Sequence, residues 1–151
     1  MSNNSISCYV LPALPMPILL PVECVASVVE NPRIVALKNS TTNWMRGHIT
    51  WKNQRVPVLS YSALHDSDLN EAKKTKPHVV VLNPIPEATR KAYAGILCFG
   101  KIKQIKIDPS ITSGKLPDNM DRRYADAVIM NGKTQYIIPK LSALGVAFTY
   151  F

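Results

Sequence analysis

The sequence contains little glycine, few aromatic residues and little cysteine. Six of its 151 residues are Gly, the aromatic residues Phe, Trp and Tyr make up 7%, and the three cysteines are Cys8, Cys24 and Cys98. The cysteines are odd in number and form no CxxC pair, so the sequence indicates neither a disulfide framework nor a zinc knuckle. Such cysteine usage is typical of a reducing compartment, and we expect a cytoplasmic protein.

Patterns for secretion and for membrane insertion are also missing. The first basic residue is Arg33, so the basic region of a secretory signal peptide is not found. The apolar stretch 8–22 is interrupted by four prolines. It is also shorter than the about 20 residues that a spanning helix needs. We therefore expect no direct membrane insertion. The twelve prolines also exclude long helices over much of the chain.

No motif combines the residue types and the spacing that catalysis requires. Residues 95–101 have the GxxxxGK spacing of a phosphate-binding loop, but the intervening residues are bulky and apolar, and Ile102 stands where Ser or Thr would hold Mg²⁺. This segment is better interpreted as a core strand. His48, His65 and His78 have no metal-ligand spacing, and no GxSxG elbow occurs. We expect no enzymatic activity, no metal and no cofactor.

Positive charge is the clearest compositional excess. Eighteen Lys and Arg face ten Asp and Glu, which gives a formal net charge of +8. Such a charge favours acidic partners through long-range attraction. Nucleic acid, an acidic protein surface and an anionic membrane are all partners of this kind, and the charge also serves solubility.

The stretch WMRGHITWKNQRVPVLSYSAL predicts a β-hairpin with a basic tip. Apolar and polar residues alternate in its first half, so Ile49 and Trp51 share one face of a strand. The sequence Lys-Asn-Gln-Arg then predicts a turn, with Asn53 in a left-handed conformation. VPVLSY returns as a second strand, and Pro57 is expected at a sheet edge because proline cannot donate a ladder hydrogen bond.

Further short strands follow at regular intervals. PHVVVLNP, residues 93–99 and 101–107, and the two arms around Asn131-Gly132 all have strand patterns, and PKLSAL predicts a brief helix. Several short strands separated by turns predict an all-β barrel or sandwich. The residues that we expect in its core are Val22, Val25, Ile49, Val58, Val80, Ile96, Ile129 and Ile137.

Over nearly its whole length the sequence resembles the CheW-like coupling proteins of bacterial chemosensory systems. LLPVECVASVVEN is similar to the opening strand of the family, and Gly47 and Pro57 keep the spacing of its most characteristic block. HVVVLN, GILCFG and AVIMNGKTQYIIPKLSAL are similar to the remaining strands and the terminal element. The stretches WMRG and WKNQRVPVLS look closest to adaptors of the type IV pilus, or twitching motility, branch.

The resemblance implies a single CheW-like domain over residues 1–151. Its fold would be two small five-stranded SH3-like barrels packed together, with a short C-terminal helix. The barrels would cover roughly 8–65 and 77–140, and the helix roughly 139–145. The implied activity is that of a non-catalytic adaptor, which couples the cytoplasmic tip of a methyl-accepting chemoreceptor to a CheA-type histidine kinase.

The resemblance also implies a partner-binding surface around the first hairpin. Its candidate residues are Val25, Arg46, Gly47, Trp51, Lys52, Asn53 and Arg55. The chain departs from the family pattern at Ser27, at the tip Lys52-Asn53 where Arg-Gly is usual, at Ser60-Tyr61-Ser62 and at Cys98-Phe99. A basic β-barrel that binds nucleic acid is the alternative, and it requires aromatic residues among the basic ones on an exposed face.

Overall fold

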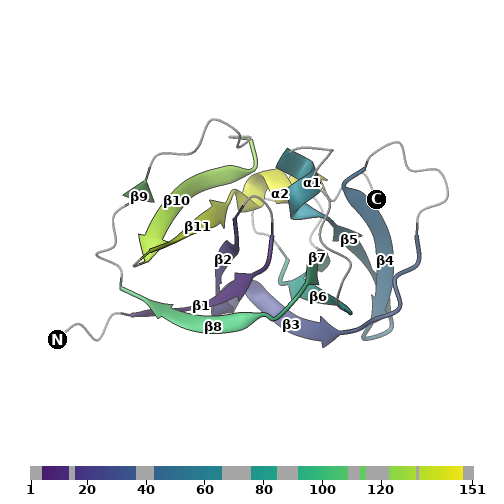
Figure 1. Ribbon diagram of the computed structural model, residues 1–151. Helices are drawn as coiled ribbons and strands as arrows, with labels where there is room; N and C mark the ends of the chain where they lie inside the picture. The colour runs from purple at the N-terminus through teal and green to yellow at the C-terminus, as the bar shows by residue number, and fades with distance from the viewer. Residues whose placement is uncertain are drawn as a thin grey trace.

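The computed structural model describes residues 5–13, 16–36, 43–65, 76–84, 92–108, 113–114, 123–131 and 133–147. In this part of the chain nearly all regular structure is β-strand, accompanied by two short α-helices and one 3-10 turn (Figure 1). The all-β fold class predicted from the sequence is confirmed, and so is the brief helix that follows the last strand.

The strands form two sheets. The six-stranded sheet has the order β8-β1-β2-β11-β10-β9. Its strands are β1 (Ile6–Leu11), β2 (Ile18–Pro21), β8 (Lys103–Ile107), β9 (Ser113–Gly114), β10 (Ala125–Asn131) and β11 (Thr134–Pro139). The five-stranded sheet has the order β3-β6-β7-β5-β4. Its strands are β3 (Val25–Glu30), β4 (Met45–Trp51), β5 (Gln54–Leu59), β6 (Pro77–Leu82) and β7 (Ala94–Phe99). Apart from the two-residue β9, each sheet has five strands.

The six-stranded sheet combines β1 and β2 with β8–β11, whereas the five-stranded sheet contains β3–β7, which lie between them in the sequence. β1 and β2 pair with β8 and β11 of the second half, and the β2–β11 ladder is parallel. The expected division into 8–65 and 77–140 therefore does not coincide with the two sheets. The expected boundary lies between α1 (Tyr61–His65) and β6. Residues 66–75 of this segment lie outside the described residues.

Three hydrophobic clusters fill the interior. One cluster lies within the five-stranded sheet, with Ile49, Val56 and Val79 among its members, and we call it the β4–β7 cluster. A second lies within the six-stranded sheet around Cys8 and Leu19, and we call it the β1–β8 cluster. The largest, the shared cluster, contains residues of both sheets and of both helices. Each fully buried aliphatic side chain contributes about 1.5–3 kcal/mol to folding, so the shared cluster joins the two sheets into one unit.

β6 and β7 are buried on both faces. Val79 and Val81 of β6 belong to the β4–β7 cluster, whereas Val80 and Leu82 belong to the shared cluster. Because successive side chains of a strand point to opposite faces, a strand covered on both sides needs an unbroken apolar run. This explains the sequences HVVVL and AGILCF, and it confirms that the Gly95–Phe99 segment is a core strand.

Two short helices accompany the sheets. α1 follows β5, and α2 (Leu141–Ala147) follows β11. Both are at the top of Figure 1, between the two sheets, and Leu64 of α1 and Leu144 of α2 are buried in the shared cluster. The prolines at both ends of β2 and after β6 end regular structure, as expected from the missing N–H donor.

Six of the eight predicted core residues are buried; Val22 and Val25 are only half-buried. Val22 lies in the 3-10 turn η1 (Val22–Cys24), and Val25 begins β3, an outer strand of its sheet. Pro57 was expected at an edge, but β5 lies between β4 and β7. It is accommodated because the ladder with β7 begins one residue later, at Val58. The sequence pattern also missed β1, because no strand was expected in residues 6–11.

Candidate functional site

The tip of the β4–β5 hairpin is a two-residue turn. Trp51 lies opposite Gln54, and the intervening Lys52 and Asn53 have φ angles of 49° and 63°. Positive φ at both central residues is characteristic of a type I′ turn, whose twist matches that of the flanking strands. The left-handed conformation predicted for Asn53 is confirmed. Lys52 shares it, although a lysine adopts this conformation only at a cost of order 1 kcal/mol.

Trp51 fixes the tip to the body of the five-stranded sheet. Its half-buried ring packs against the β4–β7 cluster and meets the ring of Tyr93 edge-on, with centroids 4.9 Å apart and planes at 66°. The Nζ of Lys52 lies 4.8 Å from the centroid of the same indole. A cation–π contact of this kind is worth about 0.5–1 kcal/mol at an exposed site. It therefore offsets much of the strain of the left-handed lysine.

The tip presents charge and an aromatic ring together. Lys52, Asn53, Gln54 and Arg55 are all exposed, while Trp51 keeps part of its surface accessible. Trp and Arg are the residue types most enriched among interface hot spots. Tyr93 was missed by the sequence reasoning because it precedes β7, far from the hairpin in the chain.

Gly47 has a structural task. Its φ is +133°, and a Cβ there would lie 2.0 Å from the carbonyl oxygen of Val35. Val35 and His48 exchange two backbone hydrogen bonds of 2.8 and 2.9 Å, which hold the segment after β3 against β4. Glycine is required because only a residue without a side chain allows this approach. The neighbouring Arg46 lies at a register shift between Met45 and Gly47 and is half-buried.

The structure does not bring Val25 together with the hairpin tip. Val25 lies on β3 and packs against the shared cluster, whereas Trp51 lies on β4 and packs against the β4–β7 cluster. β3 and β4 are the two outer strands of the five-stranded sheet. The seven candidate residues therefore lie in at least two separate parts of the sheet. The tip itself consists of Trp51, Lys52, Asn53 and Arg55.

The departure from the family pattern at Ser60-Tyr61-Ser62 has a structural role, because all three residues are buried. The Oγ of Ser60 accepts a hydrogen bond of 3.2 Å from the backbone N–H of Ala63 and so caps α1. The hydroxyl of Tyr61 donates to the carbonyl of Tyr124 at 2.5 Å. The capping serine could have predicted α1 from the sequence.

A groove with a volume of about 570 Å³ lies among β2, β10, β11 and the start of α2. Leu19, Ile138 and Leu141 contribute apolar surface, and Asp126 and Lys140 contribute charge. Asp126 lies at a register shift of the β10–β11 ladder, and a bulge of this kind redirects a side chain.

The thiol of Cys24 also lines this groove, and burial raises its pKa, with a further upward contribution from the carboxylate of Glu23. Burial, Glu23 and Cys24 likewise raise the pKa of the Cys8 thiol. Both thiols therefore stay protonated and unreactive at neutral pH. Cys8, Cys24 and Cys98 are all free, and Cys98 is buried in the shared cluster.

The described ranges contain neither a metal site nor a membrane-spanning helix. These ranges contain no group of three or more His, Cys, Asp or Glu side chains placed to hold a metal ion. None of their helices has the length and the apolar character to cross a membrane.

Two comparisons relate this architecture to known proteins. The family model for the CheW-like domain matches residues 16–145, and the chain belongs to this family. The structure is similar to the crystal structure of the scaffolding protein TtCheW from Thermoanaerobacter tengcongensis, with a TM-score of 0.72 at 16% sequence identity over 90% of this chain and 89% of that one. The fold of two SH3-like barrels is therefore the fold of this chain. A search of curated proteins gave no match.

Proposed function

We propose that the protein is a non-catalytic cytoplasmic adaptor, which couples the tip of a chemoreceptor to a CheA-type histidine kinase. The observation that carries the proposal is the match of residues 16–145 to the CheW-like domain. The similarity in fold to a scaffolding protein supports it. An adaptor needs a stable body with preformed contact surfaces, and the shared cluster together with the hairpin tip fits this requirement.

The hairpin tip is the surface that we assign to partner binding. Lys52 and Arg55 are exposed cations, and Trp51 is held in place by Tyr93. A tip that is ordered before binding loses less conformational entropy when a partner docks. Lys52 occupies the position of a family arginine and keeps the charge, but it lacks the bidentate fork of a guanidinium group. We therefore expect Arg55 to be the stronger of the two charged contacts.

Of the other candidates, Arg46 and Gly47 support this surface from within β4, and Val25 contributes at a separate place on β3. The sequence similarity of WKNQRVPVLS supports a role in the branch that controls type IV pilus twitching. Neighbouring genes for a CheA-type kinase, receptors or pilus components would agree with this assignment. Deletion of the gene should then abolish twitching, and normal twitching in the deletion strain would contradict it.

A pulldown tests the tip directly. Lys52→Glu/Arg55→Glu should reduce capture of the kinase or of the receptor's cytoplasmic fragment about tenfold or more, since loss of charged interface contacts typically costs more than about 1.4 kcal/mol. Lys76→Glu/Lys133→Glu is the matched control, because both lysines are exposed and the change in net charge is the same. Equal capture of the two folded double mutants would remove the tip from the functional surface.

The nucleic-acid alternative requires a stacking platform. Among the described residues no aromatic side chain is fully exposed; each is buried or half-buried. The half-buried Trp51 beside Lys52 and Arg55 is a single partly accessible ring, whereas stacking of successive bases requires several, so this part of the chain favours the adaptor.

A further inference from the structure

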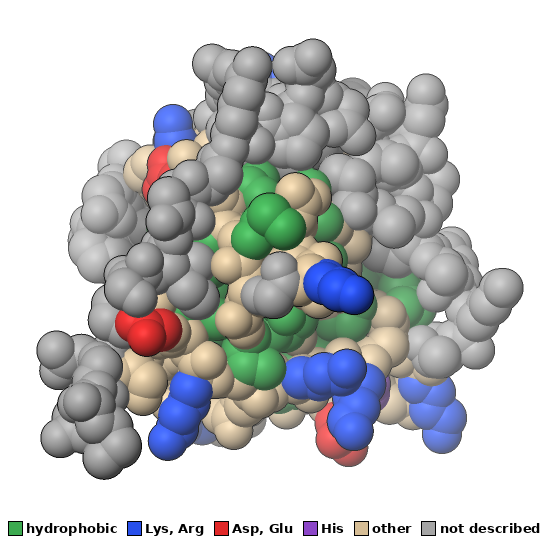
Figure 2. Space-filling view, turned by 60° about the vertical axis from the view of Figure 1, so that its left-hand side comes forward, with side chains coloured by type: hydrophobic (Ala, Val, Ile, Leu, Met, Phe, Trp, Pro, Cys, Tyr) green, Lys and Arg blue, Asp and Glu red, His purple; other side chains and the backbone are tan. Residues whose placement is uncertain are grey.

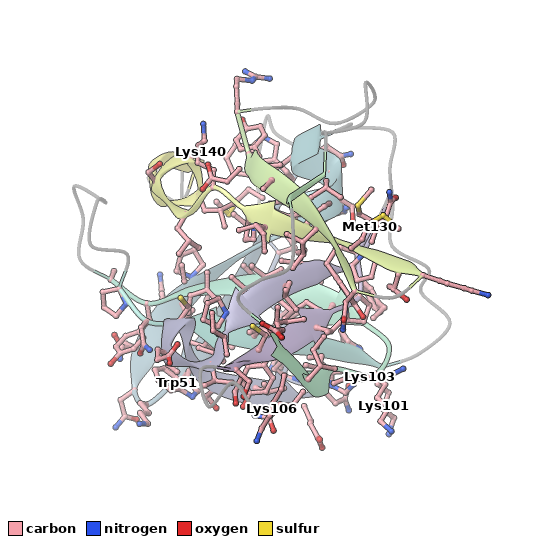
Figure 3. All side chains as sticks on the ribbon, turned by 90° about the vertical axis from the view of Figure 1, so that its left-hand side faces the viewer. Trp51, Lys101, Lys103, Lys106, Met130 and Lys140 are labelled. Atoms are coloured by element: carbon pink, nitrogen blue, oxygen red, sulfur yellow. The ribbon has the colours of Figure 1, made fainter. Side chains whose placement is uncertain are left out.

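β8 is an outer strand of the six-stranded sheet. It pairs with β1 over residues 103–107 and has no second partner among the described strands. An outer strand of this kind presents unpaired N–H and C=O groups along its free edge. Figure 3 shows Lys101, Lys103 and Lys106 together at the lower side of the molecule, with their side chains directed outward.

The ladders determine which backbone groups of β8 face outward. The N–H of Ile137 donates to the carbonyl of Pro17 at 2.9 Å, and Ile137 lies opposite Ile18 in a parallel pair. Pro17 therefore faces β11, and by the alternation of backbone groups along a strand Ile18 and Leu20 face β1. Leu20 lies opposite Tyr9, so Tyr9 directs its N–H and C=O toward β2.

The same alternation continues across β1. Because Tyr9 faces β2, its neighbours Cys8 and Val10 face β8, where they lie opposite Ile105 and Lys103. The remaining residues of β8, Gln104 and Lys106, therefore direct their N–H and C=O groups away from the sheet. These are the groups that an additional strand would engage.

The side chains beside this edge are strongly basic. Lys101, Lys103 and Lys106 are exposed, whereas Ile105 and Ile107 turn toward the β1–β8 cluster. The side chains of Lys103 and Ile105 lie on the same face of β8, and that of Lys106 lies on the opposite face. Positive charge therefore flanks the edge on both sides. No ion pair joins these three lysines to another residue that the structure describes. Figure 2 shows Lys and Arg side chains along the lower margin of the molecule.

We propose that the free edge of β8 binds an extended acidic segment of a partner protein, which adds as a further strand. Its backbone would pair with Gln104 and Lys106, and its carboxylates, which alternate between the two faces, would meet Lys101, Lys103 and Lys106. Strand addition gives affinity through main-chain hydrogen bonds, and the side chains on alternate positions give specificity. Pairing with β8 of a second copy of the chain is disfavoured, because the lysines of the two copies would lie side by side and repel each other.

The charge requirement is tested with a fluorescein-labelled peptide that carries Glu at consecutive positions, so that its carboxylates project on both faces of the added strand. Fluorescence anisotropy should show binding that weakens with added salt, since exposed charges are screened. Lys101→Glu/Lys103→Glu/Lys106→Glu should weaken it at least about tenfold. The control Arg33→Glu/Arg123→Glu/Lys133→Glu reverses the same number of exposed charges elsewhere and should bind within about twofold of the wild type. An equal loss of peptide affinity in the two variants would show that only the net charge matters, and it would overturn the proposal.

The requirement for backbone hydrogen bonds is tested at Gln104, because this uncharged residue can be substituted without changing the charge of the edge. Gln104→Pro removes the outward N–H and should abolish peptide binding, whereas Gln104→Thr keeps the N–H and should preserve it. If Gln104→Pro does not fold, a peptide with alternate N-methylated residues makes the same test on the wild type. Unchanged binding in either experiment would overturn strand addition, and tighter binding of an oligothymidine probe than of the peptide would overturn the choice of an acidic protein segment.

Discussion

The hydroxyl of Tyr61 donates a hydrogen bond to the backbone carbonyl of Tyr124, 2.5 Å away. Tyr61 belongs to α1, which follows β5 of the five-stranded sheet, and Tyr124 immediately precedes β10 of the six-stranded sheet. The bond therefore links the two barrels at the place where the family pattern has a different sequence. It gives a structural reason for the tyrosine at this position.

Tyr61→Phe should lower the free energy of unfolding by about 0.5–1.5 kcal/mol, the usual net contribution of a hydrogen bond. The measurement is a urea denaturation curve. Tyr136→Phe is the control, because Tyr136 is also buried, in the β1–β8 cluster, and its hydroxyl makes no hydrogen bond with a described residue. Equal effects of the two substitutions would show that the Tyr61–Tyr124 bond contributes nothing.

Gly47→Ala should destabilise the protein far more than Gly100→Ala. Both glycines have positive φ, but a Cβ at Gly47 meets the Val35 carbonyl at 2.0 Å, whereas the nearest atom at Gly100 is 3.5 Å away. We expect a loss of more than about 3 kcal/mol at Gly47, and about 1–2 kcal/mol at Gly100 from backbone strain alone. Thermal denaturation compares the two, and similar midpoints would contradict the assignment of Gly47 as a close-approach glycine.

Lys52→Asn should separate stability from binding at the hairpin tip. Asparagine tolerates the left-handed conformation at Lys52 better than lysine does, so the melting temperature should rise, corresponding to about 0.5 kcal/mol. Loss of the cation at the tip should at the same time weaken capture of the kinase or receptor. A variant with lower stability would show that the contact of Lys52 with Trp51 outweighs the strain.

The Cys24 thiol should react slowly with iodoacetamide in the folded protein. Burial, and then the carboxylate of Glu23, raise its pKa, so less thiolate is present at a given pH than in the unfolded chain. In a Cys8→Ala/Cys98→Ala background, Glu23→Gln should shift the rate profile toward lower pH, and Glu30→Gln should not. Identical profiles for both variants would exclude the effect of Glu23.

The same shift affects stability with a definite sign. A thiol whose pKa is raised by folding keeps its proton when the unfolded chain has lost it. Its contribution therefore decreases as the pH rises through the ordinary thiol pKa. A decrease in stability at alkaline pH should be smaller in Cys24→Ala than in the wild type, as measured by urea denaturation across this pH range.

Local sequence patterns predicted the elements with strong periodicity. The strand pairs around Lys52-Asn53 and Asn131-Gly132 follow from alternation and turn chemistry, and β6 and β7 follow from unbroken apolar runs. The turn residue Gly132 itself lies outside the described residues. Patterns of this kind act over a few residues, and they identify a strand without its partners.

Long-range pairing could not be predicted in this way. Nothing in residues 6–21 indicates that β1 and β2 join strands of the second half, because that choice depends on complementary surfaces distant in the chain. For the same reason the contact of Tyr93 with Trp51 and the close packing of Gly47 against Val35 were not predicted.

The pairing of β2 with β11 has a consequence for synthesis on the ribosome. β2 is synthesised before β3–β10, and its partner residue Ile137 only after them. Until then β1 and β2 remain without the strands that complete their barrel, while β3–β7 are already available to assemble. All strands of the five-stranded barrel are thus synthesised before β11, and the six-stranded barrel can close only after β11 has left the exit tunnel. A chaperone that shields nascent apolar strands would accordingly find its target in β1 and β2.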